Sequence, residues 1–406
     1  MNFALLGDDP AALPLLRAIA GSSEHRLARA ALAGPMERAV RELIPEAELH
    51  SDWARLLLDR ELNSVIVCGT NAGVLEGARH IAAAGTALML LPQAGQGSTF
   101  AYELALVRDD TGVLLFPVFP RRVHPLRVRL RERIEAGRFG RILHLQMERE
   151  HRPARDRGTA TMSFAESDHA LLLDADLLRD VGGDYDQVTA LRSGETPVGI
   201  ALTTVTLAGP GLPEALWRLR PAAGEPKWRL TLTGERGTAV LSGGGELSEV
   251  RLETGDENHV SEPGAAVFDV GDELLRQFEQ AAGGAAFRPD WSDLTRAFEI
   301  VDASHRSVRR RRTIDLHFEE TSERNQFKSH MAALGCGLLM LTLLGVVVLL
   351  IAGAVFIIPA GVMQVARVLV FLPLFVFLGL QVLVFLARPS QSRGESPSTD
   401  AAKKQE

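Results

Sequence analysis

Ser64-Val-Ile-Val-Cys-Gly-Thr-Asn71 begins with five residues that have the composition of a fully buried strand, and it ends on turn-forming residues. A helical pattern follows from Val74 to Ala84, and another apolar strand pattern runs from Ala87 to Leu91. The same alternation precedes this stretch, with strand patterns at 2–6 and 25–33 and helical patterns at 11–20 and 36–43. Strands that alternate with helices predict a parallel, doubly wound α/β domain over residues 1–120.

The pattern changes after about Pro120. Later apolar segments lie close together, and Gly234-Glu235-Arg236-Gly237 has the composition of a tight turn between two of them. Strands joined by short turns predict an antiparallel sheet. We therefore expect a second, α+β domain over residues 121–320 with a largely antiparallel sheet. Its expected elements are a helix at 126–135, strands at 198–207, 228–233 and 238–242, and helices at 271–281 and 291–306.

The apolar surplus of the chain lies after Met331. Hydrophobic residues make up 46% of the 406 residues, and the stretch 331–358 contains no charged residue. A second apolar run covers residues 368–387, after a short connector at 359–367. A membrane-spanning helix needs about 20 such residues, so the two runs predict a transmembrane helical hairpin. The alternative is a buried core hairpin, but a soluble core does not need two uncharged runs of this length.

Basic residues flank the predicted hairpin on its outer sides, whereas the connector carries only Arg367. They are Arg309, Arg310, Arg311, Arg312, Arg324 and Lys328 before the first run, and Arg388, Arg393, Lys403 and Lys404 after the second. Positively charged flanks stay in the cytoplasm. We therefore expect an integral membrane protein whose soluble domains and C-terminal tail, residues 388–406, face the cytoplasm. The polar tail is expected to be disordered, and the lipid bilayer is the first expected partner.

Charge and cysteine content argue against two classes of function. The net charge of −7 speaks against nucleic acid as a partner, since a phosphate backbone requires a basic protein face. Cys68 and Cys336 are the only cysteines, too few for a disulfide framework or a cysteine metal cluster. We therefore expect neither nucleic-acid binding nor a metal site.

Four stretches, taken in order, give the first 317 residues a resemblance to a known family. They are Ser64–Asn71, Arg122-Val-His-Pro125 with the following Ile134–Gly140, Leu230–Gly237, and Trp291–Val301. These stretches resemble a strand end, the opening of the second domain, a sheet turn and the closing helix of the glucose–fructose oxidoreductase / inositol dehydrogenase / MocA (Gfo/Idh/MocA) family. The resemblance implies a Rossmann-like domain followed by an α+β domain, and NAD(P)-dependent chemistry on sugars or polyols.

The cofactor loop departs from the pattern of that family. A Gly-x-Gly-x-x-Gly loop lets the backbone approach the diphosphate closely, and the matching segment here is Gly7-Asp8-Asp9-Pro10-Ala11-Ala12. Gly7 and Ala12 suit the first and third positions, but Asp8 and Asp9 direct negative charge towards a diphosphate. The alternative interpretation of both aspartates is a helix N-terminal turn that acidic side chains stabilise.

The remaining cofactor contacts are equally degenerate. The acid that binds the ribose is expected at the end of the second strand, where this chain has Ala33 and Gly34. Asn71 matches the asparagine of the family's Thr-Pro-Asn and could contact a cofactor, although it equally suits a helix N-cap. The resemblance thus implies cofactor contacts at Gly7, Ala12 and Asn71, with NAD(P) binding that is weak or absent.

The catalytic lysine of the family has no counterpart. It lies in Glu-Lys-Pro on the strand after an Ala-Gly step, and here Ala84-Gly85 leads to Leu91-Pro92-Gln93. The first lysine of the chain is Lys227, so a small alignment gap does not restore it. The nearest basic residue that follows is Arg108, and a guanidinium does not give up its proton as a lysine does.

The resemblance also implies an acid–base pair of aspartate and histidine, spaced four residues apart. The alignment puts His169 at the aspartate position and Leu173 at the histidine position, and Asp176 matches a further aspartate of the family. A shift of one helical turn would instead make His169 the general base, with Asp168 or Asp174 beside it. The catalytic candidates are therefore His169, Asp174 and Asp176.

Two groups of arginines have more than one interpretation. Arg122, with its neighbour Arg121, resembles the family's interdomain arginine, which suits either substrate contact or a tie between the domains. Arg309 to Arg312 could attract anionic substrates, but next to a membrane they are better explained as positive charge facing the lipid.

The sequence as a whole predicts a membrane-anchored member of the family that has lost its catalysis. Such a protein would act as a binding or scaffolding module, as a homo-oligomer or together with a related oxidoreductase. The alternative is an active NAD(P)-dependent oxidoreductase of sugars or polyols with relocated catalytic residues. A third hypothesis is a module that senses a sugar or nucleotide sugar without turning it over.

Overall fold

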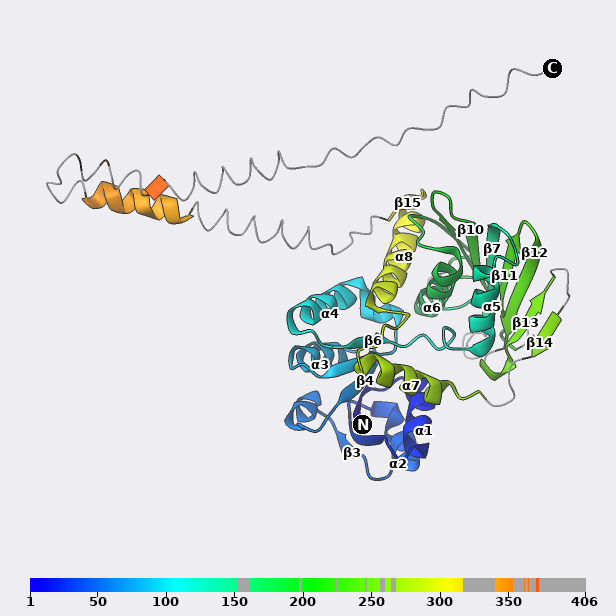
Figure 1. Ribbon diagram of the computed structural model, residues 1–406, viewed down its shortest axis with the longest axis horizontal. Coiled ribbons are helices and arrows are strands. Elements are labelled where there is room, and N and C mark those ends of the chain that lie inside the picture. The colour runs from blue at the N-terminus through cyan, green and yellow to red at the C-terminus, as the bar shows by residue number, and fades with distance from the viewer. Residues whose placement is uncertain are drawn as a thin grey trace, which may run out of the picture. The chain divides into compact units, whose positions relative to one another are not determined.

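The computed structural model describes residues 1–151, 161–196, 199–222, 225–244, 247–255, 260–263, 268–316 and 340–352, together with residues 361, 364, 370 and 371. Contacts divide the chain into two compact units, Met1–Phe318 and Glu319–Glu406. The first unit holds two sheets with their helices (Figure 1).

The first sheet has six strands in the order β3-β2-β1-β4-β5-β6, and every pair is parallel. Its central strand, β4, has all five residues buried, because helices cover both faces and leave no solvent side. The predicted doubly wound sheet is therefore confirmed. The strands are β1 (Asn2–Gly7), β2 (Arg26–Ala31), β3 (Glu48–His50), β4 (Ser64–Cys68), β5 (Ala87–Leu90) and β6 (Leu115–Pro117).

Helices cover both faces of this sheet (Figure 1). On one face lie α3 (Ala72–Ala83) and α4 (Gly97–Thr111), and on the other α1 (Leu13–Gly21), α2 (Glu37–Leu43) and α7 (Val270–Ala282). Short 3-10 turns are η1 (Pro10–Ala12), η2 (Gly34–Met36), η3 (Trp53–Leu58) and η4 (Ala94–Gln96). Helix α7 follows most of the second domain in the sequence but belongs to the first domain, because it packs against α1. Gly271 permits this contact, since a side chain there would overlap the carbonyl of Pro14.

The second sheet has nine strands in the order β14-β13-β12-β11-β7-β10-β9-β8-β15, and only β7 and β10 pair in parallel. Helices α5 (Pro125–Glu135), α6 (Phe164–Gly182) and α8 (Trp291–Arg310) pack against one face. The strands are β7 (Ile142–His151), β8 (Gln187–Ser193), β9 (Leu202–Ala208), β10 (Glu214–Pro221), β11 (Trp228–Gly234), β12 (Gly237–Gly243), β13 (Arg251–Thr254), β14 (Val260–Pro263) and β15 (Ile314–Asp315). The predicted α+β domain with a largely antiparallel sheet is confirmed.

The alternation of buried and exposed residues shows how this second sheet is used. On β11 the side chains alternate between the core and the opposite face, and β10 and β7 repeat this pattern. A period of two is the signature of a sheet with one packed face and one open face. The strand predicted at 198–207 begins only at Leu202, because the preceding residues Gly199 and Ile200 form isolated bridges instead.

The second unit is described for residues 340–352, which are helical and expose large apolar side chains such as Met340 and Leu350. Within the described residues, no helix has the length and apolar character needed to cross a membrane. Most of the predicted spans at 331–358 and 368–387, and the whole tail at 388–406, lie outside the described residues. The membrane anchor, the cytoplasmic orientation and the disordered tail therefore stay predictions.

Candidate functional site

The carboxyl edge of the first sheet is where a doubly wound fold binds its ligands, and the loop after β1 begins there. Gly7 has a φ of +116° and pairs with Cys68 across the sheet. A side chain at Gly7 would overlap the Cys68 carbonyl oxygen, which accepts a hydrogen bond from the Asp8 N–H at 2.9 Å. Gly7 is therefore required by the close approach of two strands, whether or not a cofactor binds. Burial raises the pKa of the Cys68 thiol to about 12, so it stays protonated.

Asp9 is the N-cap of η1, the short 3-10 turn that follows β1. Its Oδ1 accepts a hydrogen bond from the Ala11 N–H at 2.7 Å, and its Oδ2 accepts one from the Gln93 side chain. Pro10 at the first position of η1 has no N–H to offer. A helix N-terminus attracts negative charge, and here the charge is internal. The alternative interpretation of the Asp8-Asp9 pair, an N-terminal turn, is confirmed for Asp9.

Asp8 lies between the ends of neighbouring strands. A methyl group built on Gly34 would be 3.3 Å from its Oδ2, and one built on Gly69 would be 3.4 Å from its Oδ1. The carboxylate of Asp8 therefore reaches across the edge where β1, β2 and β4 end. Ala33, at the predicted ribose position, is buried with 2% of its surface exposed, and neither it nor Gly34 carries a polar side chain.

Amide side chains stand where the family has its lysine. Gln93 follows β5 and forms a capping box with Gln96 at the ends of η4. The Gln96 side chain donates to the carbonyl oxygens of Gly69 at 3.2 Å and Leu91 at 3.1 Å. These bonds tie the loop after β5 to the loop after β4 and leave no amine at this position.

Two further cofactor candidates have structural roles. The Oδ1 of Asn71 accepts a hydrogen bond from the Val74 N–H at 2.9 Å, which makes Asn71 the N-cap of α3. Ala12 is fully buried where η1 meets α1, and it packs into the core beside Leu15 and Leu16. Neither residue needs a cofactor to explain its identity.

Asp174 of α6 is fully buried and has both carboxylate oxygens engaged. Arg121 donates to it at 2.5 Å, Arg149 at 2.5 and 2.6 Å, and the Trp217 indole N–H at 2.8 Å. Burial alone would raise the pKa of this carboxyl, but Arg149 and Arg121 outweigh it and hold the pKa below its usual range. Arg121 also stacks over Trp228, with its guanidinium carbon 5.0 Å from the ring centre. This geometry favours a structural anion over a general base.

Asp176 faces a second cluster, separate from Asp174. It accepts two hydrogen bonds from Arg122, at 2.7 and 2.9 Å, and Arg122 also bonds Asp180. Burial alone would lower the pKa of Arg122, but Asp176 and Asp180 outweigh it and raise that pKa above its usual range. With 6% of its surface exposed, Arg122 joins the segment after β6 to α6, which is the geometry of a tie between the domains.

His169 is the candidate that faces the first domain. It is half-buried on α6, which packs against η4. Burial lowers the pKa of its imidazole, while Asp9 opposes this by attracting the charged form and Arg149 adds to the lowering. His169 is therefore neutral near pH 7 and lies within electrostatic range of Asp9. Asp168, its neighbour in sequence, is bonded elsewhere, by Arg192 and His305 at 2.8 Å each.

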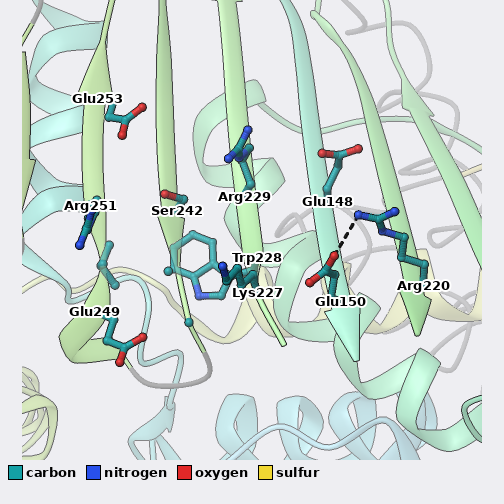
Figure 2. A pocket seen from close by; sticks show the side chains of 13 residues that line it. Glu148, Glu150, Arg220, Lys227, Trp228, Arg229, Ser242, Glu249, Arg251 and Glu253 are labelled. Atoms are coloured by element: carbon teal, nitrogen blue, oxygen red, sulfur yellow. Dashed lines mark hydrogen bonds and ion pairs between the residues drawn. The ribbon is translucent and has the colours of Figure 1, made fainter. Parts of the chain in front are cut away.

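A separate hollow of about 900 Å³ lies on the open face of the second sheet. Figure 2 shows its charged side chains on adjacent strands, with Glu253 and Arg251 on β13, Arg229 on β11 and Glu148 on β7. Arg229 lies opposite Glu148 in the strand register, and Glu148 lies opposite Arg218 of β10. Charges of both signs thus alternate across a face that the helices of the domain do not contact.

The sequence did not single out three residues of the buried site. Arg149 on β7 and Trp217 on β10 meet Asp174 only because those two strands pair in parallel, with Met147 opposite Trp217. Gln93 meets Asp9 only because β1 and β5 both flank β4. Within the described residues, no cluster of three potential metal ligands is found.

No protein-family model and no curated protein matches this sequence. Several solved structures are similar to the structure of this chain. A putative myo-inositol dehydrogenase from Sinorhizobium meliloti 1021 is similar with a TM-score of 0.62 and 20% identity over 78% of this chain and 100% of its own. An oxidoreductase from Agrobacterium radiobacter, in complex with NAD⁺, L-tartaric acid and magnesium, has a TM-score of 0.65 and 16% identity over 78% and 98%.

Levoglucosan dehydrogenase in complex with NADH has a TM-score of 0.66 and 16% identity over 78% of this chain and 99% of its own. These neighbours are oxidoreductases of the Gfo/Idh/MocA type. The first unit of this chain therefore has the fold that the resemblance implied, a Rossmann-like domain followed by a mixed-sheet domain.

The buried pairs of Asp174 generate a stability prediction. Replacing Asp174→Asn leaves Arg121 and Arg149 buried without their counter-charge and is expected to lower the free energy of unfolding by about 3–5 kcal/mol at pH 7. A carboxyl with a depressed native pKa stabilises above its unfolded pKa of about 3.9. The difference between the two proteins should therefore persist from pH 7 to 5 and shrink as the pH falls further.

Urea unfolding at several pH values measures this difference. The matched control is Asp110→Asn, an exposed aspartate on α4, which should change the unfolding free energy by less than about 0.5 kcal/mol. An Asp174→Asn protein as stable as the natural chain would show that the carboxylate is not the counter-ion of the two arginines.

Proposed function

We propose that this chain is a catalytically inactive protein with the Gfo/Idh/MocA fold, and that it works as a binding or scaffolding module at the cytoplasmic face of a membrane. The observation that carries the proposal is the Asp9 carboxylate. It accepts hydrogen bonds from the Ala11 N–H and the Gln93 side chain, at the turn where this fold receives a diphosphate. A diphosphate that used the same N–H would have to displace the carboxylate first.

Charge repulsion adds to this competition. Asp8 supplies a second carboxylate at the same edge, near Gly34 and Gly69. Two like unit charges about 4 Å apart repel by about 1 kcal/mol in bulk water and by about 4 kcal/mol near a protein surface. A nicotinamide cofactor would meet this repulsion at its most highly charged group.

Other losses occur at separate positions. Ala33 and Gly34 give the ribose no side-chain acceptor, and Gln93 stands at the lysine position. Losses at well-separated positions add roughly. Three or four of them at about 1–3 kcal/mol each would weaken a micromolar cofactor site to the millimolar range or beyond.

Calorimetric titration with NAD⁺, NADH, NADP⁺ and NADPH tests the loss of the cofactor site. We expect no dissociation constant tighter than about millimolar. Levoglucosan dehydrogenase, which binds NADH in its solved complex, is the positive control. The double variant Asp8→Ala, Asp9→Gly removes both charges and should bind NADH more tightly than the natural chain. Dissociation constants of tens of micromolar or tighter in the natural chain would contradict the proposal.

A second candidate function is an active NAD(P)-dependent oxidoreductase of sugars or polyols that uses His169 as general base. The observation that favours it is the imidazole itself, which burial keeps neutral and which lies within electrostatic range of Asp9 at the junction of the two domains. A neutral imidazole is the protonation state that a general base needs. Two results would favour this function over the binding module: the natural chain binds a nicotinamide cofactor in the titration, and its turnover of a sugar or polyol is lost in His169→Gln.

The open sheet face supports pairing with a second sheet of the same kind, in a homo-oligomer or with a related oxidoreductase. Its central positions are Val240, Thr231, Gln146 and Leu216, which lie side by side on four neighbouring strands. The next row places Glu148 between Arg229 and Arg218. A patch that holds both signs of charge around less polar positions can complement itself across a two-fold axis.

Sedimentation of the full chain in detergent tests the pairing. Leu216→Arg puts a third arginine beside Arg218 and Arg229 at the centre of the face, and we expect it to shift the protein to the monomer. The control Arg38→Glu alters an exposed charge on α2, on the first domain, and should leave the assembly unchanged. A Leu216→Arg protein that assembles like the natural chain would mean that another surface is used.

The membrane anchor rests on the two uncharged runs, 331–358 and 368–387, and on the arginines around them. Each run has about the length that a spanning helix requires. The basic excess lies outside the pair of runs, which favours both ends in the cytoplasm. The anchor would hold the soluble unit near the bilayer, where a scaffolding module meets membrane-bound partners.

Reporter fusions test the anchor and its orientation. A reporter after Glu406 and one before Met331 are both expected to signal the cytoplasm, whereas one in the connector at 359–367 should signal the opposite side. The three fusions serve as controls for one another, because a soluble chain would give the same signal at all three sites. Release of the full chain from membranes by salt alone, without detergent, would overturn the anchor.

A further inference from the structure

A cavity of about 550 Å³ opens between α4 and α8. Two hydroxyls of α4, from Ser98 and Tyr102, line one side. A row of charged side chains on α8 lines the other, at positions spaced by three and four residues on one helix face. Its volume lies within the range of small-molecule sites.

The acidic residues of the cavity are already satisfied by the hydroxyls. Tyr102 donates its hydroxyl hydrogen to Glu299, and Ser98 donates to Asp302 at 2.5 Å. At the rim, Asp315 accepts a hydrogen bond from Gln187 at 3.2 Å. Each of these carboxylates thus accepts a hydrogen bond from a neutral side chain, and none forms an ion pair with Arg306 or Arg309.

Arg306 and Arg309 are the two arginines of the cavity. Neither forms a hydrogen bond or an ion pair with any residue that the structure describes, and the Nε of Arg306 is buried without a partner. A buried guanidinium N–H normally has an acceptor, because leaving it unpaired costs free energy. Arg306 could reach Asp302 one turn earlier on α8, but that carboxylate is turned towards Ser98 instead.

We propose that this cavity binds a small oxyanion, the phosphate group of a metabolite or of a lipid headgroup, through Arg306 and Arg309. Guanidinium groups bind phosphate oxygens in a fork of parallel hydrogen bonds. The two arginines lie three residues apart on α8, so both can face the same anion. The site is independent of the cofactor edge and of the proposed loss of catalysis.

Anion binding in this cavity is expected to depend on pH, because the cavity holds a titratable carboxyl group. Burial raises the pKa of Glu299 to about 7, with Arg306 lowering it and Asp302 raising it. The other groups facing this carboxyl are Tyr102 from α4 and His305 from α8. Below pH 7 Glu299 becomes neutral and no longer repels an anion, so binding should strengthen as the pH falls from 8 to 6.

Calorimetric titration of the full chain in detergent with sulfate tests the site, because sulfate keeps its charge over this pH range. We expect saturable binding that Arg306→Gln weakens by about tenfold or more. Arg306→Lys, which keeps the charge without the fork, should bind with intermediate affinity. The matched control is Arg312→Gln, which removes the same charge just beyond α8 and outside the cavity and should leave binding unchanged. Glu299→Gln should bind sulfate more tightly and flatten the pH dependence.

Two phosphate probes distinguish the source of the anion. Binding of inorganic phosphate that depends on Arg306 supports a soluble phosphorylated ligand. Binding of short-chain phosphatidic acid alone, with the same dependence on Arg306, supports a lipid headgroup. Absence of saturable binding for all three probes, or equal weakening by Arg312→Gln and Arg306→Gln in proteins with unchanged melting temperatures, overturns the proposal.

Discussion

The Asp174 carboxylate holds together parts of the chain that are remote in sequence. Arg121 comes from the segment after the first sheet, Arg149 from β7 and Trp217 from β10, and all three donate to one buried group on α6. Removal of the Asp174 carboxylate would leave the two arginines without their counter-charge, which is far more costly than the loss of a surface ion pair. The second domain therefore keeps a fixed geometry relative to the end of β6, and α6 keeps its contact with η4. The neighbouring cluster of Arg122, Asp176 and Asp180 reinforces the same junction.

The same cluster bears on the residues that the sequence nominates for catalysis, because arginines bond both Asp174 and Asp176. An acidic residue on the helix facing a cofactor domain suits a general base only when its oxygens are free to accept a proton. The oxygens of Asp174 are fully engaged and its pKa is depressed, so protonation is opposed. His169 is different, because burial makes its neutral form the stable one, and the charged groups near it have both signs, with Asp9 and Asp174 opposing the effect of Arg149 and Arg121.

At the carboxyl edge of the first sheet, too, polar groups find their partners within the chain. A fold that leaves free N–H groups at a helix start invites an anion, and Asp9 supplies that anion from within the chain, with Gln93 as its second donor. The close approach of Gly7 to Cys68 already requires a glycine at this position, so the glycine is not evidence for phosphate binding. Elsewhere, on α8, the opposite holds. Arg306 and Arg309 form no hydrogen bond or ion pair with any described residue, and the Nε of Arg306 is buried without a partner, so an anion can supply the missing acceptors there.

The sequence by itself determined the sheet classes and their order. The uninterrupted apolar run of β4 reports burial on both faces, and the alternation along β11 and β10 reports a sheet with one open face, because these patterns follow directly from strand geometry. It also predicted that the cofactor site of the family is incomplete, since Ala33 and Gly34 carry no ribose acceptor and Gln93 is not a lysine. Only the tertiary structure decided what Asp9, Asp174 and Arg306 do. Asp9 meets Gln93, and Asp174 meets Arg149 and Trp217. The buried Nε of Arg306 has no hydrogen-bond partner among the described residues. Which distant residue meets a charge depends on strand order and helix packing, and no local pattern carries that information.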